Sequence, residues 1–387
     1  MNSADRYPYP VARIGIIGGG QLGRMLVKAA KRLGCVCTVL DPTPNSPAGQ
    51  VSGRQIVADC RDPAALRALV ESCDLTTFDL EDIDSATLHE LSREGRPIFP
   101  CPAVLATLQD KLLQKMALQS AGLPTAPFRA MPTPDPELCA AFGYPLVQKA
   151  CRGGYDGRGV VVMRGPEDFA YHLPVTGLIE RFIPAVKELA VIVARGRDGH
   201  CRCYPPVEMR MRPDGHLLEL LLAPARVSPA IAAAAEALAL RTIRALDGVG
   251  VFGIELFLTA HDELLINEIA PRTHNSGHYT IEACVTDQFE QHLRAIVGLP
   301  LGDTTLLAPA ATLNLLGAPG HAGAPVIVGL RAALAIPGVA VHLYGKAITR
   351  PLRKMGHVTV VDRTVEQALA KAERVRELIA IVAEEPV

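Results

Sequence analysis

The sequence of 387 residues contains no tryptophan, and aromatic residues make up only 4% of it. This scarcity argues against recognition of single-stranded nucleic acid by base stacking and fits cores built from aliphatic side chains. The formal net charge is −1, from 39 Lys and Arg against 40 Asp and Glu. No bulk positive charge is therefore present to neutralise a nucleic-acid backbone, and we expect no nucleic-acid partner.

A long apolar run is also missing. The most apolar stretch, residues 217–240, is interrupted by charged residues and prolines. No run approaches the roughly 20 residues needed to span a bilayer, so we expect no membrane partner. Residues 1–10 lack the basic-then-apolar order of a secretory signal, which predicts a cytoplasmic location.

Cysteine occurs at ten positions, but never at the spacing of a zinc or redox site. Cys35 and Cys37 are two positions apart, as are Cys201 and Cys203, and no pair forms C-x-x-C. We expect free thiols that behave as small apolar side chains in a reducing compartment.

The N-terminal segment has the pattern of a parallel α/β sheet. Residues 12–17 and 35–40 are strand-like and flank a helical pattern over 21–33 that Gly34 stops. Apolar stretches near 75–78 and 97–100 extend the predicted sheet, and such strand–helix–strand units imply parallel pairing. We predict an α/β protein with α+β elements in three parts: a Rossmann-like domain (1–107), a central domain (108–302) with a lid (about 124–186), and a small C-terminal module (303–387).

The central and C-terminal parts alternate helical and strand patterns. We expect helices over 110–121, with Leu112, Leu113, Met116 and Ala117 on one apolar face, over 229–246 after the cap Ser228, and over 364–384. Strands are expected over 144–150, 251–258 and 264–269, and the proline-rich segment 126–137 is expected to be a surface connection.

A glycine turn follows the first strand-like run. Gly18, Gly20 and Gly23 fit G-x-G-x-x-G, and Gln21 at its apex is a neutral donor within reach of a phosphate oxygen. Three interpretations stay open: a phosphate or phosphosugar contact, a nicotinamide or flavin site with Asp41 on a ribose, or a tight structural turn.

A second glycine loop lies beside a strand lysine, Lys149. Strand-like residues 146–149 and 160–162 flank a loop with four glycines, two arginines and Asp156. Such a hairpin can fold over a polyphosphate, with glycine amides as donors and Lys149 and Arg158 as neutralising charges. Asp156 suits contact with a second substrate or an arginine, and the alternative is a surface hairpin.

Two acidic residues occupy neighbouring strands. Glu255 points away from the apolar face of 251–258, and Asn267 and Glu268 lie on the next strand. Hard oxygen ligands of this kind suit magnesium that bridges substrate phosphates. A four-residue loop over 260–263 would place Glu255 opposite Glu268, and a slip by one would place Asn267 there unless a bulge intervenes. Solvated or salt-bridged carboxylates are the alternative.

Two polar segments complete the candidate site. Residues 272–279, RTHNSGHY, suit an anion-binding and sugar-binding loop, with Arg272 for a phosphate or carboxylate and His274 and Asn275 for hydroxyls or an imidazole. Residues 344–346 and 353–357 form a late cationic cluster, for which a solvated basic face is the alternative.

Together these motifs resemble the ATP-grasp ligases and, among them, the 5-(carboxyamino)imidazole ribonucleotide synthase family of purine biosynthesis. The matching runs are GGGQLGRM (18–25), GGYDGRG (153–159), NEIAPRTHNSGHY (267–279), QFEQHLR (288–294), NLLG (314–317), YGK (344–346) and RKMGH (353–357).

The resemblance implies a pre-ATP-grasp domain over 1–107, an ATP-grasp domain over 108–302 and a homodimer. It implies that ATP, bicarbonate and aminoimidazole ribonucleotide give the N-carboxylated nucleotide, ADP and phosphate through carboxyphosphate, with Mg²⁺ as cofactor. It assigns ATP binding to Lys111, Lys149, Gly154, Tyr155, Asp156, Gly157, Arg158, Gly159, Glu180, Arg181, Phe182, Ile183, Glu188, Asn267 and Glu268. It assigns the other nucleotide to Gly20, Gln21, Leu22, Asp79, Glu81, Arg272, His274, Asn275, Lys346 and Arg353, catalysis to Asp156, Arg272, Lys346 and Lys354, and magnesium to Glu255 and Glu268.

The chain departs from the family pattern at two places. The family commonly has T-x-E-x-E-N-V where residues 77–83 are TFDLEDI, so Asp79 replaces a longer acid. It usually has E-N-x-H where Glu208 is followed by Met209, Arg210 and Met211. Three other functions stay open: an ATP-grasp ligase or formyl-type transferase with a shifted substrate, a nucleotide-cofactor oxidoreductase that uses the 18–23 turn, and a non-enzymatic nucleotide sensor.

Overall fold

The computed structural model describes residues 9–154, 159–212 and 217–384. The N-terminal part is a four-stranded sheet in the order β3-β2-β1-β4, and all of its neighbouring strands are parallel, which confirms the predicted strand–helix–strand units. The stretch near 97–100 joins this sheet only through a single bridge between Thr76 and Ile98. The elements are β1 (Arg13–Ile17), α1 (Gln21–Arg32), β2 (Val36–Leu40), α2 (Gly49–Ser52), β3 (Gln55–Ile56), α3 (Pro63–Glu71), β4 (Leu75–Phe78), α4 (Ser85–Arg93) and α5 (Pro102–Leu108).

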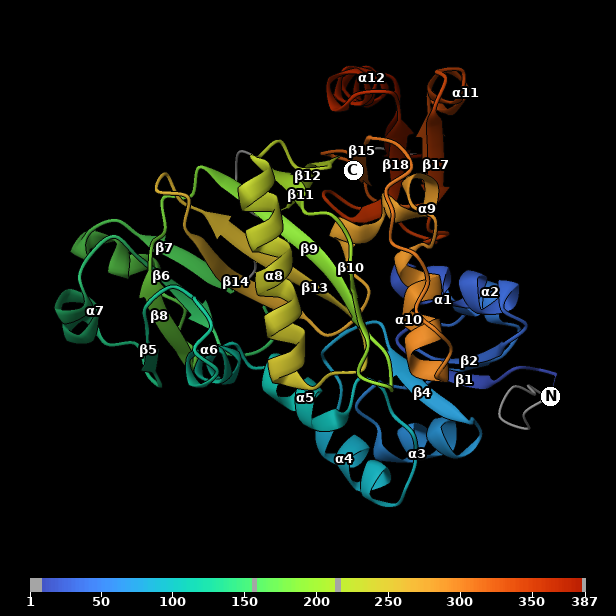
Figure 1. Cartoon of the computed structure of the whole chain (residues 1–387), viewed down its shortest axis with the longest axis horizontal. Helices are drawn as coiled ribbons and strands as arrows, with labels where there is room; N and C mark the ends of the chain where they lie inside the picture. The colour runs from blue at the N-terminus through green and yellow to red at the C-terminus, as the bar shows by residue number, and fades with distance from the viewer. Residues whose placement is uncertain (1–8, 155–158, 213–216, 385–387) are drawn as a thin grey trace.

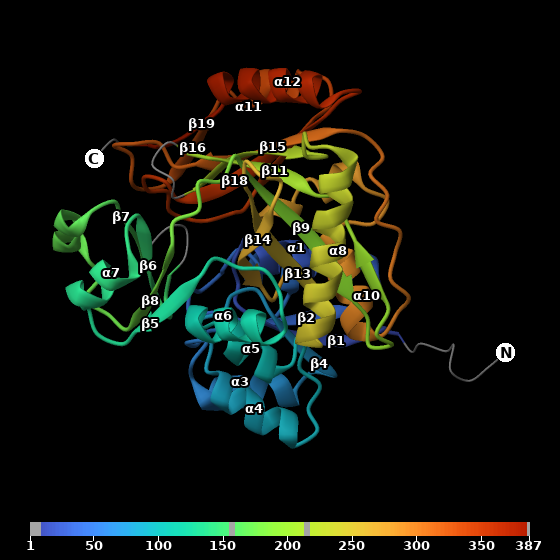
Figure 2. The same ribbon diagram turned by 60° about the vertical axis from the view of Figure 1, so that its left-hand side comes forward.

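The second part begins with α6 (Lys111–Ser120), and a small antiparallel sheet follows in the order β5-β8-β6-β7. It stands apart from the large sheet in Figure 2. The expectation that 126–137 is only a surface connection was wrong, because residues of this segment pair as an edge strand and begin a helix. The elements are β5 (Phe128–Met131), α7 (Pro136–Phe142), β6 (Leu146–Ala150), β7 (Val160–Met163), a 3-10 helix (Pro166–Tyr171) and β8 (Gly177–Arg181).

The apolar face predicted for α6 was also wrong. Leu113 and Met116 are 43% and 49% exposed, whereas Gln114, Lys115 and Leu118 are buried. A periodic apolar pattern fails here because the buried polar side chains find specific partners in the site, which offset their loss of hydration.

A nine-stranded sheet forms the body of the molecule, in the order β14-β13-β9-β11-β12-β15-β18-β17 with β10 paired to β9. It continues across the predicted boundary at residue 302 through the pairing of β12 with β15. Figure 1 shows α8 lying over one face of this sheet. The strands are β9 (Lys187–Arg195), β10 (Cys201–Cys203), β11 (Val207–Met211), β12 (Leu218–Ala223), β13 (Gly250–Leu258), β14 (Leu264–Ala270), β15 (Ala310–Leu316), β17 (Val339–Leu343) and β18 (Lys354–Val361).

The remaining helices pack around this sheet. In α8 the Ser228 hydroxyl accepts a hydrogen bond from the Ile231 amide, as predicted for its cap. The expected helix over 364–384 was too long: α12 ends at Leu378, and β19 then pairs with β16. The elements are α8 (Pro229–Leu246), a 3-10 turn (Asn275–Gly277), α9 (Thr280–Ala283), α10 (Gln288–Val297), β16 (Pro325–Val328), α11 (Leu330–Leu334), α12 (Val365–Leu378) and β19 (Ala380–Ala383).

Two sequence expectations can be compared with the described ranges. All ten cysteines lie within them and are free, and most are buried. No helix in these ranges combines the length and apolar character required to cross a membrane.

His292 joins the N-terminal sheet to the large sheet. The Val251 amide on β13 donates to His292 Nδ1 at 3.0 Å, so the proton is on Nε2, which donates to Thr77 Oγ1 on β4 at 2.8 Å. The ring is fully buried, and burial lowers the pKa of His292 to about 3. Both domains are therefore tied to one neutral imidazole.

We expect this imidazole to make the fold acid-sensitive. The folded state resists protonation of His292, whereas the unfolded chain protonates it below about pH 6.5. Its stability contribution is therefore full above pH 6.5 and lost as the pH falls. Between pH 7.5 and 5.5, the free energy of unfolding measured in urea should fall by about 1 kcal/mol less for His292→Asn than for the wild type. The exposed His261→Asn should keep the wild-type pH dependence, and equal dependence in His292→Asn would contradict this account.

Candidate active site

The β13–β14 hairpin places two carboxylates opposite each other. Leu258 pairs with Leu264, so the loop is one residue longer than predicted, and a bulge after Glu255 takes up the extra residue at Asn267. Glu255 therefore faces Glu268 across the pair. The predicted opposition is correct, and the bulge is what restores it.

The two carboxylates differ sharply in their electrostatic surroundings. Glu268 loses hydration, but Lys111 Nζ lies 2.6 Å from its Oε1 and, with Lys149, lowers the pKa of Glu268 to about 2. Loss of hydration together with the charges of Glu268 and Glu188 raises the pKa of Glu255 to about 7. One carboxylate is fixed as an anion, and among the described residues its neighbour has no lysine or arginine as close as Lys111 is to Glu268.

This donor set fits a divalent cation. Within the described part of the chain, no group of three or more His, Cys, Asp and Glu side chains gathers as a complete metal site. Glu255 and Glu268 would supply two carboxylates, and substrate phosphates would supply further oxygens, which is how magnesium is commonly held. The charge repulsion at Glu255 is what such a cation would relieve.

A buried ionic chain lies beside the carboxylates. Lys149 Nζ is 2.6 Å from Glu180 Oε1 and donates to Asn267 Oδ1 at 2.9 Å. Glu180 Oε2 is 2.9 Å from Lys115 Nζ, and the Lys115 side chain is only 3% exposed. Lys115 was not among the residues predicted from the sequence, although it follows Lys111 by four residues and so lies on the same side of α6. Glu180 therefore pairs with both lysines, and its assigned contact with ATP stays a prediction.

The loop after β14 approaches the same place. Arg272 Nε lies 2.9 Å from Glu81 Oε1, which ties the loop to the N-terminal domain. His274 Nε2 is 3.5 Å from Glu255 Oε1, and its Nδ1 is 2.8 Å from the Ser276 hydroxyl. Burial, with the positive charges of Arg272 and Lys354, lowers the pKa of His274 to about 3, so the imidazole is neutral. Asn275 follows, in the 3-10 turn.

The glycine turn before α1 is closed by the protein itself. Asp79 Oδ2 accepts hydrogen bonds from the Gly20 and Gly23 amides, each at 2.9 Å. Gly18 has a φ of 95°, and a Cβ there would come within 1.7 Å of Asp79 Oδ1. Asp41 accepts from the Gly19 amide, where the oxidoreductase interpretation placed a ribose. The position where a dinucleotide phosphate would meet this helix is filled by Asp79, which favours the structural-turn interpretation.

We expect Asp79→Ala to destabilise the N-terminal domain. Burial raises the pKa of Asp79 to about 6. Its carboxylate nevertheless caps α1 by accepting two hydrogen bonds from backbone amides, and alanine would leave both amides without this partner. The free energy of unfolding should fall by about 2 kcal/mol in urea titrations at pH 7.5. Asp82→Ala, which removes only an exposed ion pair with Arg61, should change it little. Equal losses would show that Asp79 does not cap the helix.

One member of the late cationic cluster acts on the candidate site, and the assigned substrate contacts of the others stay predictions. Lys354 begins β18 and acts electrostatically on His274. Lys346 Nζ lies 5.7 Å from the Tyr344 ring centroid, in a loop whose Gly345 carbonyl accepts from Gln50 of the N-terminal domain. Arg353 instead donates to the Ile348 carbonyl of its own loop at 2.6 Å.

The glycine loop is described only at its two ends. Lys149 pairs with Val160, so the predicted hairpin of β6 and β7 is present, and the Ala150 amide donates to the Gly159 carbonyl. Glu188 on β9 acts electrostatically on Glu255, as a residue of the same site should. Gly154 and Gly159 border the loop, Arg181 ends β8, and Phe182 and Ile183 come directly after it. The predictions for Tyr155, Asp156, Gly157 and Arg158 lie outside the described residues.

Met209, one of the two departures from the family pattern, is a core residue here. Its side chain is 6% exposed and packs in a cluster with Ala190, Ile192 and Leu221. It pairs across the sheet with Glu188, so it borders the carboxylate site from the side. Met211 ends β11.

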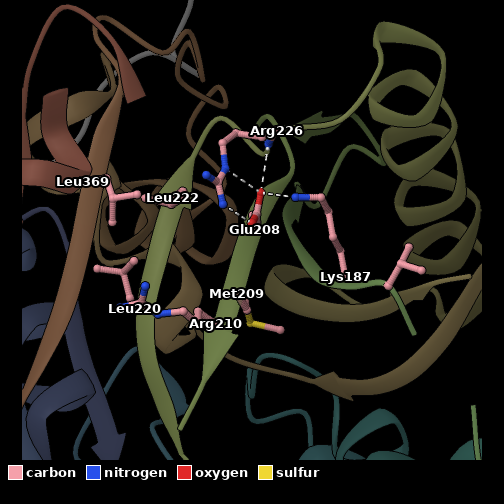
Figure 3. A pocket seen from close by; sticks show the side chains of 9 residues that line it. Lys187, Glu208, Met209, Arg210, Leu220, Leu222, Arg226 and Leu369 are labelled. Carbon is pink, nitrogen blue, oxygen red and sulfur yellow. Dashed lines mark hydrogen bonds and ion pairs between the residues drawn. The ribbon is translucent and has the colours of Figure 1, made fainter. Parts of the chain in front are cut away.

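Glu208 lies on the other face of the same strand. Its carboxylate accepts from Lys187 Nζ at 2.8 Å and from Arg226, and the three side chains line a pocket of about 230 Å³ (Figure 3). Glu208 pairs with Leu189, whose side chain packs in the core beneath α8. Met209 also lines this pocket, so the pocket lies beside the strand that borders the carboxylate site.

Three family models match the chain in sequence order. A ribonucleotide synthetase preATP-grasp domain matches residues 11–109, an ATP-grasp domain 116–289, and a phosphoribosylaminoimidazole carboxylase C-terminal domain 310–371. The N5-carboxyaminoimidazole ribonucleotide synthase of Synechococcus elongatus is 42% identical over 359 residues, covering 91% of this chain and 90% of that protein. The chain belongs to the N5-carboxyaminoimidazole ribonucleotide synthase family of ATP-grasp ligases.

Solved structures of this synthase family agree. The Thermotoga maritima synthetase has a TM-score of 0.90 and 49% identity, and the match covers 96% of this chain and 100% of that one. The Aspergillus clavatus synthase in complex with ATP has a TM-score of 0.88 and 36% identity, covering 95% and 98%. The phosphoribosylaminoimidazole carboxylase of Schizosaccharomyces pombe is 40% identical, but the chain covers only 66% of it. The resemblance and the fold class that it implied are confirmed.

Proposed function

We propose that the chain carboxylates the amine of 5-aminoimidazole ribonucleotide, using ATP and bicarbonate, in purine biosynthesis. The observation that carries this proposal is the Glu255–Glu268 pair, flanked by Lys111 and Lys149 and faced by the Arg272–His274 loop. Carboxylates and lysines at one point suit a nucleotide polyphosphate, and the loop suits a second, anionic substrate. The Aspergillus clavatus enzyme has been solved with ADP and 5-aminoimidazole ribonucleotide together, which supports this pairing of substrates.

The lysines and carboxylates would organise ATP. Lys111 and Lys149 would neutralise phosphate oxygens, and Lys149 would exchange its contact with Glu180 for one with the nucleotide. Glu255 and Glu268 would hold Mg²⁺, which when bound supplies positive charge against the phosphates. Phosphoryl transfer depends mainly on positioning and charge stabilisation, which this arrangement offers.

Two bond exchanges follow in the proposed reaction. A bicarbonate oxygen attacks the γ-phosphorus and ADP leaves, which forms carboxyphosphate. Its carbon–oxygen bond then breaks to give carbon dioxide and phosphate, and the nucleotide amine attacks the carbon and loses a proton. Arg272, anchored by Glu81, would stabilise the anions, and neutral His274 would contact the reacting amine end. The remaining assigned substrate contacts stay predictions, as do a homodimer and a cytoplasmic location.

The proposal is tested by omission of one substrate at a time. ADP release should require both bicarbonate and 5-aminoimidazole ribonucleotide for full rate, with one ADP formed for each carboxylated nucleotide. ADP release that ignores the ribonucleotide would sink the substrate assignment and favour a ligase with another amine. NADH binding without ATP binding would instead support the oxidoreductase alternative.

A further inference from the structure

Buried glutamines hold backbone segments in this molecule by a repeated device. In each case the side-chain oxygen accepts from the amide of one residue while the side-chain nitrogen donates to the carbonyl of that same residue. All four of these glutamines are at most 3% exposed. The pairs are Gln114 with Ile269, Gln148 with Leu173, Gln288 with His274, and Gln291 with Gly302.

Two of these pairs lie at the two ends of one segment. Gln114 Oε1 accepts from the Ile269 amide at 2.9 Å and its Nε2 donates to the Ile269 carbonyl at 3.1 Å, next to Glu268 on the edge strand β14. Gln288 makes the equivalent bonds to His274 at 2.9 and 2.7 Å. The segment between them carries Arg272. Arg272 is thus held between two side-chain clamps, Glu268 directly precedes the clamped Ile269, and His274 is itself clamped.

Each clamp comes from a helix that is itself fixed. On α6, Lys111 reaches Glu268, Gln114 reaches Ile269 and Lys115 reaches Glu180, so one helix sets three parts of the ATP site. Gln288 is the first residue of α10, and the preceding Asp287 pairs with Arg32 of α1. The His274 loop therefore takes its position from the N-terminal domain.

We propose that Gln114 and Gln288 are positioning residues of the reaction, which hold the segment 268–274 so that Glu268 and His274 meet their substrates in register. This inference rests on the proposed function. Residues that orient a ligand or a reacting group without touching substrate commonly cost 10–100-fold when removed. A displacement of about 1 Å in such a segment is enough for that loss.

The fold supplies its own matched control. Gln291 is buried on the same helix as Gln288 and clamps Gly302 with bonds of 2.7 and 3.0 Å, outside the segment 268–274. Methionine at any of the three positions keeps the approximate volume and removes the pair of hydrogen bonds to the clamped residue, although it also removes a longer bond of Gln114 to the Leu108 carbonyl and of Gln288 to the His278 ring, each at 3.3 Å. A merely structural role therefore predicts the same stability loss and the same modest kinetic effect for all three variants.

The experiment compares Gln114→Met, Gln288→Met and Gln291→Met in the full chain, with thermal unfolding measured for each. We expect Gln114→Met to weaken MgADP binding in calorimetry and to lower the rate of ADP formation by about 10-fold or more. We expect Gln288→Met to retain ADP formation within about 3-fold while the yield of carboxylated nucleotide per ADP falls by about 10-fold. Gln291→Met should match the wild type in MgADP binding, in the rate of ADP formation and in the yield of carboxylated nucleotide per ADP.

Equal kinetics for the three variants at equal stability loss would overturn the proposal. Should a methionine variant not fold, Gln→Asn at the same position keeps the amide but shortens the side chain by one methylene group, which draws both hydrogen-bonding groups away from the backbone, and the same outcomes apply. If the wild type makes no carboxylated nucleotide, the proposed function fails by itself. MgADP binding by Gln114→Met against Gln291→Met then still decides the positioning of Glu268.

Discussion

Glu268→Gln should reduce ADP release by at least about 100-fold at saturating ATP and bicarbonate. The substitution keeps the size of the side chain but removes the anion that pairs with Lys111 at 2.6 Å and would hold the cation. The nearby lysines keep Glu268 ionised across the working pH range, since they lower its pKa to about 2. Its charge is therefore always present in the native protein, and the loss should not depend on pH between 6 and 9.

The control for this variant is Glu263→Gln. Glu263 is exposed in the loop of the same hairpin and should tolerate the change without loss of rate. MgADP binding by calorimetry should fall for Glu268→Gln and not for Glu263→Gln. Normal ADP release by Glu268→Gln would remove the carboxylate pair from the mechanism.

Glu255→Gln should separate stability from activity. Loss of hydration and repulsion from Glu268 and Glu188 raise the pKa of Glu255 to about 7, so the folded state binds a proton more tightly than the unfolded chain. The stability contribution of this group is present below about pH 4.5 and is lost as the pH rises through 7. At pH 8 the ionised carboxylate destabilises the ligand-free fold, and glutamine removes that penalty.

At pH 8 without ligands, we therefore expect the free energy of unfolding of Glu255→Gln to be about 2 kcal/mol higher than that of the wild type. This difference should shrink as the pH falls to 5. The same variant should lose most of the ADP-forming rate and the stabilisation that Mg²⁺ with ADP confers. Urea titrations at both pH values, with Glu263→Gln beside it, measure both effects. A less stable Glu255→Gln at pH 8 would show that the carboxylate is not strained by its neighbours.

The carboxylate pair could be predicted from the sequence because its cause is local. Alternation along 251–258 turns Glu255 away from the apolar face, and the short loop together with the bulge at Asn267 brings Glu268 opposite. The bulge at Asn267 itself could not be predicted, because the residues of the hairpin give no signal for it. The parallel N-terminal sheet was predictable for the same reason.

The polar face of α6 and the cap on α1 were not predictable in this way. Lys115 and Gln114 are buried because Glu180 and the Ile269 backbone, far along the chain, receive them. Asp79 closes the turn at Gly20 from a different strand. An apolar periodicity carries no information about such partners, so it assigned the buried side of α6 to Leu113 and Met116.

We propose that this site activates bicarbonate by phosphorylation. It is tested most directly with bicarbonate labelled with oxygen-18, turned over with ATP and 5-aminoimidazole ribonucleotide and followed by mass spectrometry of the released phosphate. Attack by bicarbonate on the γ-phosphorus predicts one labelled oxygen in each phosphate, because the bridging oxygen stays with phosphorus when carbon dioxide leaves. Phosphate that instead takes its new oxygen from water would contradict the account.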